Sequence, residues 1–146
     1  MREVMIERVD HIGIRVRDLE RALAFYRVLG FALSHRAKGD DVAIVKNPGG
    51  VEINLIFNAN AGAPAENILM DVPNKYPGYT HVALRVASIR ATIAALEANG
   101  IAISQGPVKF GEDGHVSVFV RDPDRNVIEL RGREQGEIEG ATPYVP

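Results

Sequence analysis

The chain has 146 residues, 46% of them apolar and 25% charged, with a net charge of −2. These values predict a folded protein with its own core and argue against disorder. The scattered lysines and arginines argue against a nucleic-acid partner, and no apolar stretch reaches the about 20 residues of a membrane span. The N-terminal residues do not resemble a signal peptide, and the chain lacks cysteine, so we expect a cytoplasmic protein without disulfides or thiolate chemistry.

The sequence repeats itself at a spacing of 70 residues. Val9–Ser34 aligns with Tyr79–Ser104 without a gap, and 7 of the 26 positions are identical. Among the aligned pairs are two histidines, His11 and His81. Such a repeat predicts that the chain contains two copies of one structural unit.

The first copy begins with a strand that ends near Val16. Asp18 is placed to cap a helix predicted over Leu19–Leu29, and Gly30 ends that helix. Two further strands follow, Val42–Lys46 and Val51–Phe57, joined by the turn Asn47-Pro48-Gly49-Gly50.

The second copy shows the same order of elements. A strand ends near Val86, Ser88 caps a helix predicted over Ile89–Ala98, and Gly100 ends it. The strands Val116–Val120 and Asn126–Arg131 flank the turn Asp122-Pro123-Asp124-Arg125. Glu129 stands six residues after Pro123, whereas Glu52 stands four after Pro48, so this turn is predicted to be two residues longer than its counterpart.

The repeat predicts an α+β fold made of two βαβββ modules within one domain, residues 1–146. Module one covers about residues 8–58, a connector rich in Pro, Gly, Asn and Ala covers 59–78, and module two covers about 79–132. Residues 133–146 are predicted to be a tail or an arm on a partner subunit.

Side chains alternate between the two faces of a strand, which assigns each residue to a face. In four predicted strands one face is apolar, and the other carries a single His or Glu: His11, Glu52, His81 and Glu129. The small residues Gly13 and Ala83 leave space beside the two histidines. Two imidazoles and two carboxylates would suit a divalent cation, and two carboxylates balance its charge.

Each of these residues taken alone has an ordinary structural explanation. A histidine on a strand is usually a satisfied polar residue, and a glutamate usually belongs to a solvated face. Their matched positions in both copies favour the metal site. His35 and His115 are predicted to lie in loops and lack this symmetry, so no function is assigned to them.

The sequence resembles the vicinal oxygen chelate superfamily, also called the glyoxalase/bleomycin-resistance/dioxygenase group. The resemblance runs from about Val9 to Arg131 and depends on DHIGIRVRDLERALAFYRVLGF, VEINL, YTHVALRV and DPDRNVIEL. It implies curled mixed sheets that form a cup around one divalent metal ion, a small-molecule substrate and a homodimer. The His/Glu/His/Glu set looks most like glyoxalase I, with nickel, cobalt or zinc, or else manganese or iron, as the metal.

By the same resemblance, a hydroxy-carbonyl or hemithioacetal substrate chelates the metal through adjacent oxygens, and a proton moves by way of an enediolate. Glu129 is the first candidate for the base and Glu52 the alternative. Arg15 matches an arginine that anchors glutathione, and Asn54 and Arg85 on the same strand faces are candidate substrate-binding residues. The glyoxalase pattern expects asparagine where Ile56 stands, which leaves open whether glutathione is the thiol.

Other members of the superfamily suggest alternative functions. They are a methylmalonyl-CoA epimerase, a fosfomycin-modifying enzyme, an extradiol-type Fe(II) dioxygenase and a non-enzymatic drug-binding protein of the bleomycin-resistance kind. The epimerases usually carry Gln at the place of Glu52, and the dioxygenases usually have about twice this length. A drug-binding cleft has no need of four metal ligands.

Overall fold

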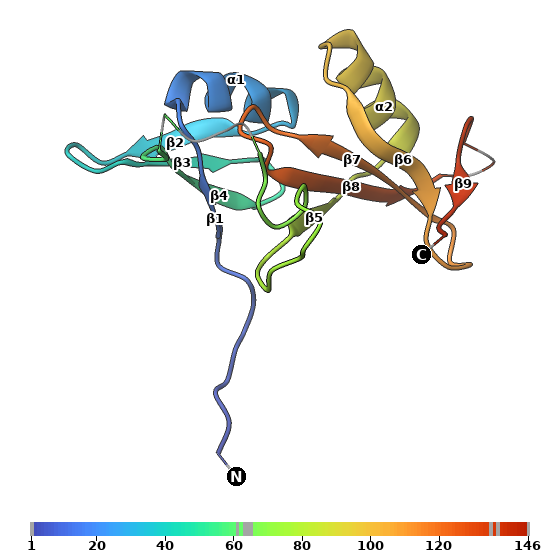
Figure 1. Ribbon diagram of the computed structural model, residues 1–146, viewed down its shortest axis with the longest axis horizontal. Helices are drawn as coiled ribbons and strands as arrows, with labels where there is room; N and C mark the ends of the chain where they lie inside the picture. The colour runs from blue at the N-terminus through green and yellow to red at the C-terminus, as the bar shows by residue number, and fades with distance from the viewer. Residues whose placement is uncertain (1, 61, 63–65, 135, 137, 146) are drawn as a thin grey trace. The chain divides into compact units, whose positions relative to one another are not determined.

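The computed structural model describes residues 2–60, 62, 66–134, 136 and 138–145. They divide into two compact units, Met1–Gly62 and Ala63–Pro146, each described by itself below. Unit 1 follows the order βαβββ, unit 2 repeats it and adds the short strand β9, and each contains a mixed sheet (Figure 1), so the predicted α+β class is confirmed. Within the described residues, no helix has the length and apolar character needed to cross a membrane.

Unit 1 contains one helix and a four-stranded sheet in the order β1-β4-β3-β2. Strands β1 and β4 run parallel, and the other neighbours run antiparallel. The elements are β1 (Ile12–Arg15), α1 (Leu19–Val28), β2 (Ala32–Arg36), β3 (Val42–Lys46) and β4 (Glu52–Ile56).

The core of unit 1 lies between α1 and the sheet beneath it (Figure 1). The helix begins as predicted, because the Asp18 carboxylate accepts a hydrogen bond from the backbone N–H of Arg21. The helix buries Ala22 and Tyr26, and the strands bury Val45, Ile53 and Leu55. This apolar burial stabilises the unit and fixes which sheet face turns away from the helix.

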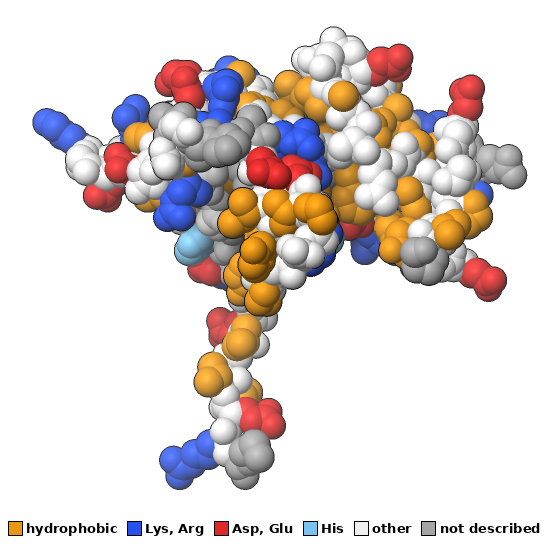
Figure 2. Space-filling model, viewed as in Figure 1, with side chains coloured by type: hydrophobic (Ala, Val, Ile, Leu, Met, Phe, Trp, Pro, Cys, Tyr) orange, Lys and Arg blue, Asp and Glu red, His pale blue; other side chains and the backbone are white. Residues whose placement is uncertain are grey.

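Residues 2–11 precede β1 and lie outside helices and strands. Their apolar side chains are open to solvent, with exposed fractions of 85% at Val4 and 89% at Met5. Figure 2 shows hydrophobic side chains along this extended segment.

Unit 2 contains a five-stranded sheet in the order β5-β8-β7-β6-β9. Strands β5 and β8 run parallel, as β1 and β4 do in unit 1. The elements are β5 (His81–Arg85), α2 (Ile89–Ala98), β6 (Ile103–Lys109), β7 (His115–Arg121), β8 (Val127–Arg133) and β9 (Thr142–Pro143).

Helix α2 packs on one face of the unit 2 sheet. The Ser88 hydroxyl caps it, as predicted, by accepting a hydrogen bond from the backbone N–H of Ala91. Ile89 packs in a buried cluster with Val116 and Ile138. Residues of the segment predicted to be a tail therefore contribute to the core, and β9 adds a strand beside β6.

The two hairpin turns have the same length, so the prediction of a longer second turn was wrong. Each joins its strands through five residues, 47–51 and 122–126. Asn47 and Asp122 start them alike, since each side chain accepts the backbone N–H four residues later. The two-residue difference in the position of the glutamate comes instead from strand register, as the site geometry shows.

Two histidines predicted to lie in loops are in strands. His35 is in β2, and His115 begins β7, where its side chain is buried. Both lie next to turns, and the sequence signal of the turns hid the ends of the strands.

A network of arginines holds the end of the predicted connector within unit 2. Asp71 accepts hydrogen bonds from Arg121 at 2.9 and 3.1 Å and contacts Arg125 at 3.4 Å. The Arg121 guanidinium and the backbone N–H of Asn67 hold the pKa of the Asp71 carboxyl well below its usual range. Positions 61 and 63–65 of the connector, and 135, 137 and 146 of the tail, lie outside the described residues.

We expect Asp71→Asn to lower the free energy of unfolding by about 1–2 kcal/mol at pH 7, because it weakens a half-buried ion pair. A lowered folded-state pKa stabilises the protein above the ordinary pKa of about 3.9. The difference from the parent chain should shrink as the pH falls below that value toward the folded-state pKa. Urea denaturation from pH 7 to pH 2 measures it, with Asp40→Asn as the exposed control. An unchanged difference across this range would contradict the prediction.

Candidate functional site

The structure places the four predicted metal ligands on the sheet faces that turn away from the helices. His11 directly precedes β1, Glu52 begins β4, His81 begins β5, and Glu129 lies within β8. The neighbours that point to the opposite faces, such as Ile53 and Ile128, are fully buried. Strand alternation thus accounts for the position of every ligand.

In unit 1, His11 and Glu52 stand side by side on adjacent parallel strands. The register pairs Ile12 with Ile53, so His11 and Glu52, which each come one residue earlier, lie opposite each other. His11 Nδ1 lies 3.9 Å from Glu52 Oε2. The side chains are 43% and 24% exposed, so this pair faces solvent.

Asp10 lies next to His11 and Glu52 and was not predicted as a site residue. Its Oδ1 lies 2.7 Å from His11 Nδ1, and the hydrogen bond from that histidine lowers the pKa of the Asp10 carboxyl. Asp10, His11 and Glu52 each present a ligand atom within 4.8 Å of the others. A carboxylate on Nδ1 keeps the proton there and leaves Nε2 as the nitrogen with a free lone pair.

Glu52 also has a cationic neighbour on the adjacent strand. Lys46 Nζ lies 3.4 Å from Glu52 Oε1, and the two residues are register partners in β3 and β4. The ammonium group partly balances the carboxylate charge. Because the lysine is exposed, this ion pair adds little stability and can rearrange.

In unit 2, His81 and Glu129 are closer together and more buried. His81 Nε2 lies 3.0 Å from Glu129 Oε1, and the side chains are 33% and 10% exposed. The register pairs Glu129 with Ala83 and pairs His81 with Val127. The glutamate is therefore two residues further along its strand than in unit 1, and it reaches the histidine across the small side chain of Ala83.

The hydroxyl of Thr80 lies 2.9 Å from His81 Nδ1, so Nε2 is the nitrogen that faces Glu129. An imidazole lone pair and a carboxylate lone pair at 3.0 Å repel unless a cation or a proton lies between them. The tautomer with a hydrogen on Nε2 supplies that proton, with Nδ1 accepting from Thr80, and a metal ion would supply the cation.

Ser117 holds the second carboxylate oxygen of Glu129. Its Oγ donates a hydrogen bond of 2.7 Å to Oε2, and Ser117 is fully buried. Gly106 of β6 lies against the same point, since a Cβ there would come within 2.6 Å of the Ser117 carbonyl oxygen. The Ser117 hydroxyl thus fixes the orientation of the carboxylate, and Gly106 allows β6 to approach the backbone of Ser117 closely.

The donor atoms fit a divalent cation. Two ligand atoms bound at 2.0–2.2 Å and at right angles to each other lie about 3 Å apart, as His81 Nε2 and Glu129 Oε1 do. Imidazole nitrogen and carboxylate oxygen are ligands that nickel, cobalt, zinc, manganese and iron accept. Each unit thus presents half of the predicted set, and the union of both halves at one metal stays a prediction.

The predicted substrate-binding residues of unit 1 line the same face as Glu52. Arg15 Nε donates to Asn58 Oδ1 at 3.0 Å, so an asparagine two residues beyond Ile56 supports that arginine. Asn54 Oδ1 is buried without a hydrogen-bond partner among the described residues. A buried polar atom without a hydrogen bond lowers the stability of the protein. We therefore expect Asn54 Oδ1 to accept a hydrogen bond from a ligand or a water molecule.

In unit 2, Arg85 lies on the same face as Glu129 and is exposed. Phe119 of β7 is the register partner of Glu129, and its ring packs edge-on against the His81 ring, with centroids 5.7 Å apart. An aromatic side chain thus shields one side of the His81–Glu129 pair. Ser117 and Phe119 were not predicted as site residues, although the alternation of β7 places both on this face.

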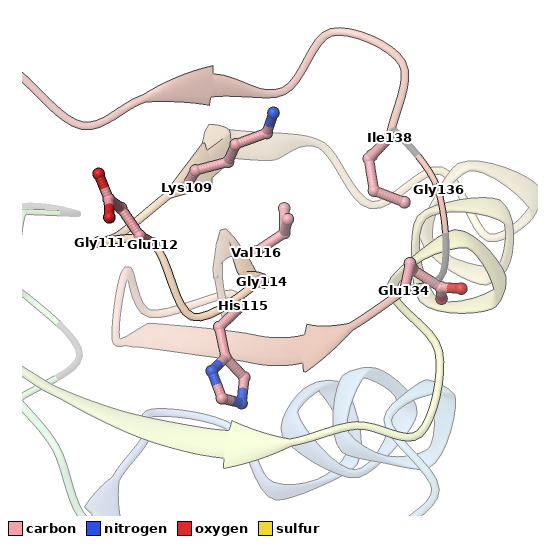
Figure 3. Close-up of a pocket in the computed structure, with 9 residues that line it drawn as sticks. All are labelled: Lys109, Gly111, Glu112, Gly114, His115, Val116, Glu134, Gly136 and Ile138. Carbon is pink, nitrogen blue, oxygen red and sulfur yellow. The ribbon is translucent and has the colours of Figure 1, made fainter.

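A pocket of about 240 Å³ lies on the other face of the unit 2 sheet. Lys109, Val116 and Ile138 point toward it, and the His115 ring leaves β7 on the opposite side from Val116 (Figure 3). Val116 points to the face opposite Glu129, and His115 also lines the pocket, so the pocket reaches the beginning of β7.

We expect Ser117→Ala to destabilise the metal-free protein by about 1.5–3 kcal/mol, because it leaves a buried carboxylate oxygen without its donor. Combined with Glu129→Gln in a double-mutant cycle, it should show a coupling energy of about 1–3 kcal/mol. Urea denaturation in the presence of EDTA measures both values. Ser104→Ala is the matched control, since its hydroxyl donates to the Phe119 carbonyl instead. Equal coupling in both cycles would contradict a specific Ser117–Glu129 bond.

The family model described as Glyoxalase/Bleomycin resistance protein/Dioxygenase superfamily matches residues 8–130. The chain is 30% identical over 122 residues to the mitochondrial methylmalonyl-CoA epimerase of Homo sapiens (80% of this chain, 68% of the epimerase). It is 31% identical over 130 residues to the lactoylglutathione lyase of Haemophilus influenzae (82% and 88%). The antibiotic binding protein TnmS3 from Streptomyces sp. CB03234 has a similar fold, with a TM-score of 0.64, 26% identity, and 90% and 100% coverage. The chain belongs to the Glyoxalase/Bleomycin resistance protein/Dioxygenase superfamily.

Proposed function

We propose that this protein is a metal-dependent isomerase or lyase of the glyoxalase I type that acts on a small hydroxy-carbonyl or hemithioacetal substrate. The observation that supports it is a histidine and a glutamate in contact distance on the same sheet face of each unit. The similarity to a lactoylglutathione lyase supports the reaction class.

His11, Glu52, His81 and Glu129 would hold one divalent metal ion, within one chain or across a homodimer. Nickel, cobalt and zinc are the first candidates, with manganese and iron as alternatives. When bound, the metal supplies a Lewis acid that stabilises negative charge on substrate oxygens. The four ligands bring two negative charges, which neutralise a divalent cation.

Glu129 is the proposed base. It is nearly buried, and Ser117 fixes one carboxylate oxygen while the other is presented at the sheet face beside His81. A fixed carboxylate can take the proton from the carbon next to the substrate carbonyl and return it to the neighbouring carbon. The proton is moved and not consumed, so the reaction is an isomerisation. Glu52, which contacts Lys46 and faces solvent, is the alternative base.

Arg15, Asn54 and Arg85 would bind the remainder of the substrate. The Arg15 guanidinium donates a hydrogen bond to Asn58. The side-chain oxygen of Asn54 can accept a hydrogen bond from the substrate, since it has no partner among the described residues. Glutathione is a candidate for the thiol part of a hemithioacetal substrate, because the similar protein of Haemophilus influenzae is named a lactoylglutathione lyase. Ile56 stands where the glyoxalase pattern has asparagine, so thiols other than glutathione belong in the same test.

Metal binding is the first test of the function. After treatment with EDTA and reconstitution with Ni²⁺, Co²⁺, Zn²⁺, Mn²⁺ or Fe²⁺, we expect the parent chain to retain metal through gel filtration, as measured by elemental analysis. His11→Ala and His81→Ala should each weaken the affinity at least about 10-fold, since each removes a ligand. His35→Ala, an exposed strand histidine, is the matched control and should retain the parent affinity. A parent chain that takes up none of these metals would refute the metal site.

Catalysis is the second test. We expect the reconstituted protein to isomerise methylglyoxal or phenylglyoxal in the presence of a thiol, followed by ultraviolet absorbance. Glu129→Gln should keep the fold and lower kcat by about 10³-fold or more, because general-base catalysis contributes on the order of 10²–10⁴-fold. Glu97→Gln on α2 is the exposed control. Near-normal turnover by Glu129→Gln would exclude Glu129 as the base, and turnover of methylmalonyl-CoA alone would favour the epimerase reaction.

A further inference from the structure

We infer that Arg85 and Arg131 form a recognition site for an anionic group of the substrate, a carboxylate or a phosphate. The inference depends on the proposed function for the claim that this anion belongs to the substrate. The anion site itself follows from the structure of unit 2 alone.

The two arginines are neighbours on the face that carries Glu129. Strands β5 and β8 run parallel, and Arg85 is the register partner of Arg131, just as Ala83 is the partner of Glu129. Paired residues on adjacent strands are about 5 Å apart and point to the same face. Two like charges in this position repel each other, and an anion bound between them would relieve that repulsion.

Both guanidinium groups have donors to spare. Arg85 is exposed, and its side chain has no hydrogen bond or ion pair to any described residue. Arg131 makes two long contacts of 3.4 Å, from its two terminal nitrogens to Ser117 Oγ and to Asp113 Oδ2. Its guanidinium also lies 5.9 Å from the centre of the Phe110 ring, which orients the group. Arginine offers five N–H donors in a planar array that matches carboxylate and phosphate oxygens.

Two carboxylates lie on the same face as the arginine pair, and Glu129 is the one held by Ser117 and His81. Asp113 is the acidic group at Arg131, and its Oδ2 is shared with His115 Nδ1 at 2.8 Å. Hydrogen bonds from the backbone and side chain of His115 lower the pKa of the Asp113 carboxyl to about 2. Asp113 thus balances the charge of Arg131, and no carboxylate of the described residues is in contact with Arg85.

His115 gives an independent indication of a ligand on this face. Its side chain is 10% exposed, and its Nε2 is buried without a hydrogen-bond partner among the residues described. It lies on the same face of β7 as Ser117, the register partner of Arg131. A buried nitrogen of this kind needs an oxygen from a ligand or a water molecule.

The strand geometry limits the length of the substrate. Arg131 is two residues beyond Glu129 on the same face, a distance of about 6.6 Å along an extended strand. A substrate whose reacting carbons lie at Glu129 would therefore carry its anionic group about four or five bonds away. This selects short-chain hydroxy-carbonyl compounds with a terminal carboxylate or phosphate.

Anion binding by the metal-free protein tests the site. Inorganic phosphate, succinate and the neutral control succinamide are titrated after treatment with EDTA, and the arginine Nε–H and histidine ring signals are followed by NMR. We expect saturable shifts at Arg85, Arg131 and His115 with the anions and none with succinamide. The tighter of the two anions identifies the group that the site selects.

Arg85→Gln and Arg131→Gln should each weaken binding about 10-fold or more, since each removes a charge-assisted hydrogen bond. Arg90→Gln, on α2 at the other face of the sheet and exposed, removes the same charge as a matched control and should change the affinity less than about 2-fold. The absence of saturable shifts, or equal weakening by all three variants, would overturn the inference.

The readout separates this inference from the proposed function. It requires neither metal nor turnover, so a negative result leaves the metal and proton-transfer tests as they stand. A protein that binds the anions and shows no isomerase activity would retain the anion site and lose the proposed reaction.

Discussion

The parallel pairing of the first strand of each unit with the strand that carries the glutamate is the constraint on which the candidate site depends. β1 pairs with β4 and β5 pairs with β8, so side chains from distant parts of the chain meet on one face. The opposite face packs on a helix and must be apolar, which directs every second residue toward the polar face. A shift of one residue in either strand pair would bury the glutamate and expose the core residues. Such a shift would therefore strongly lower the stability of the unit.

The two His–Glu pairs have the same origin and different environments. In unit 1 the pair is exposed and surrounded by Asp10 and Lys46. In unit 2 the glutamate is nearly buried, and Ser117 holds it. A rigid carboxylate in a shielded place suits proton transfer, whereas an exposed pair can adapt to a metal and to changing ligands. This difference is the physical reason to assign the base to Glu129.

Much of the fold could be predicted from the sequence. The repeat, the helix caps Asp18 and Ser88, and the apolar rows of the strands are local signals, and the structure confirms the elements they predict. Register is not a local signal, and the position of Glu129 was therefore attributed to a longer turn. The contacts of Ser117 and Arg131 arise from pairing across strands, and no spacing along the chain reveals them.

The hairpin turns of the two units have the same length and differ at one strained position. The fourth residue of each turn has a left-handed backbone, and it is Gly50 in unit 1 and Arg125 in unit 2. A side chain there costs about 1–2 kcal/mol. Arg125 offsets this by contacting Asp71 and by accepting a hydrogen bond from Asn67 at its carbonyl. The turn of unit 1 is thus free of this strain, whereas the turn of unit 2 carries it at a residue that binds the segment containing Asn67 and Asp71.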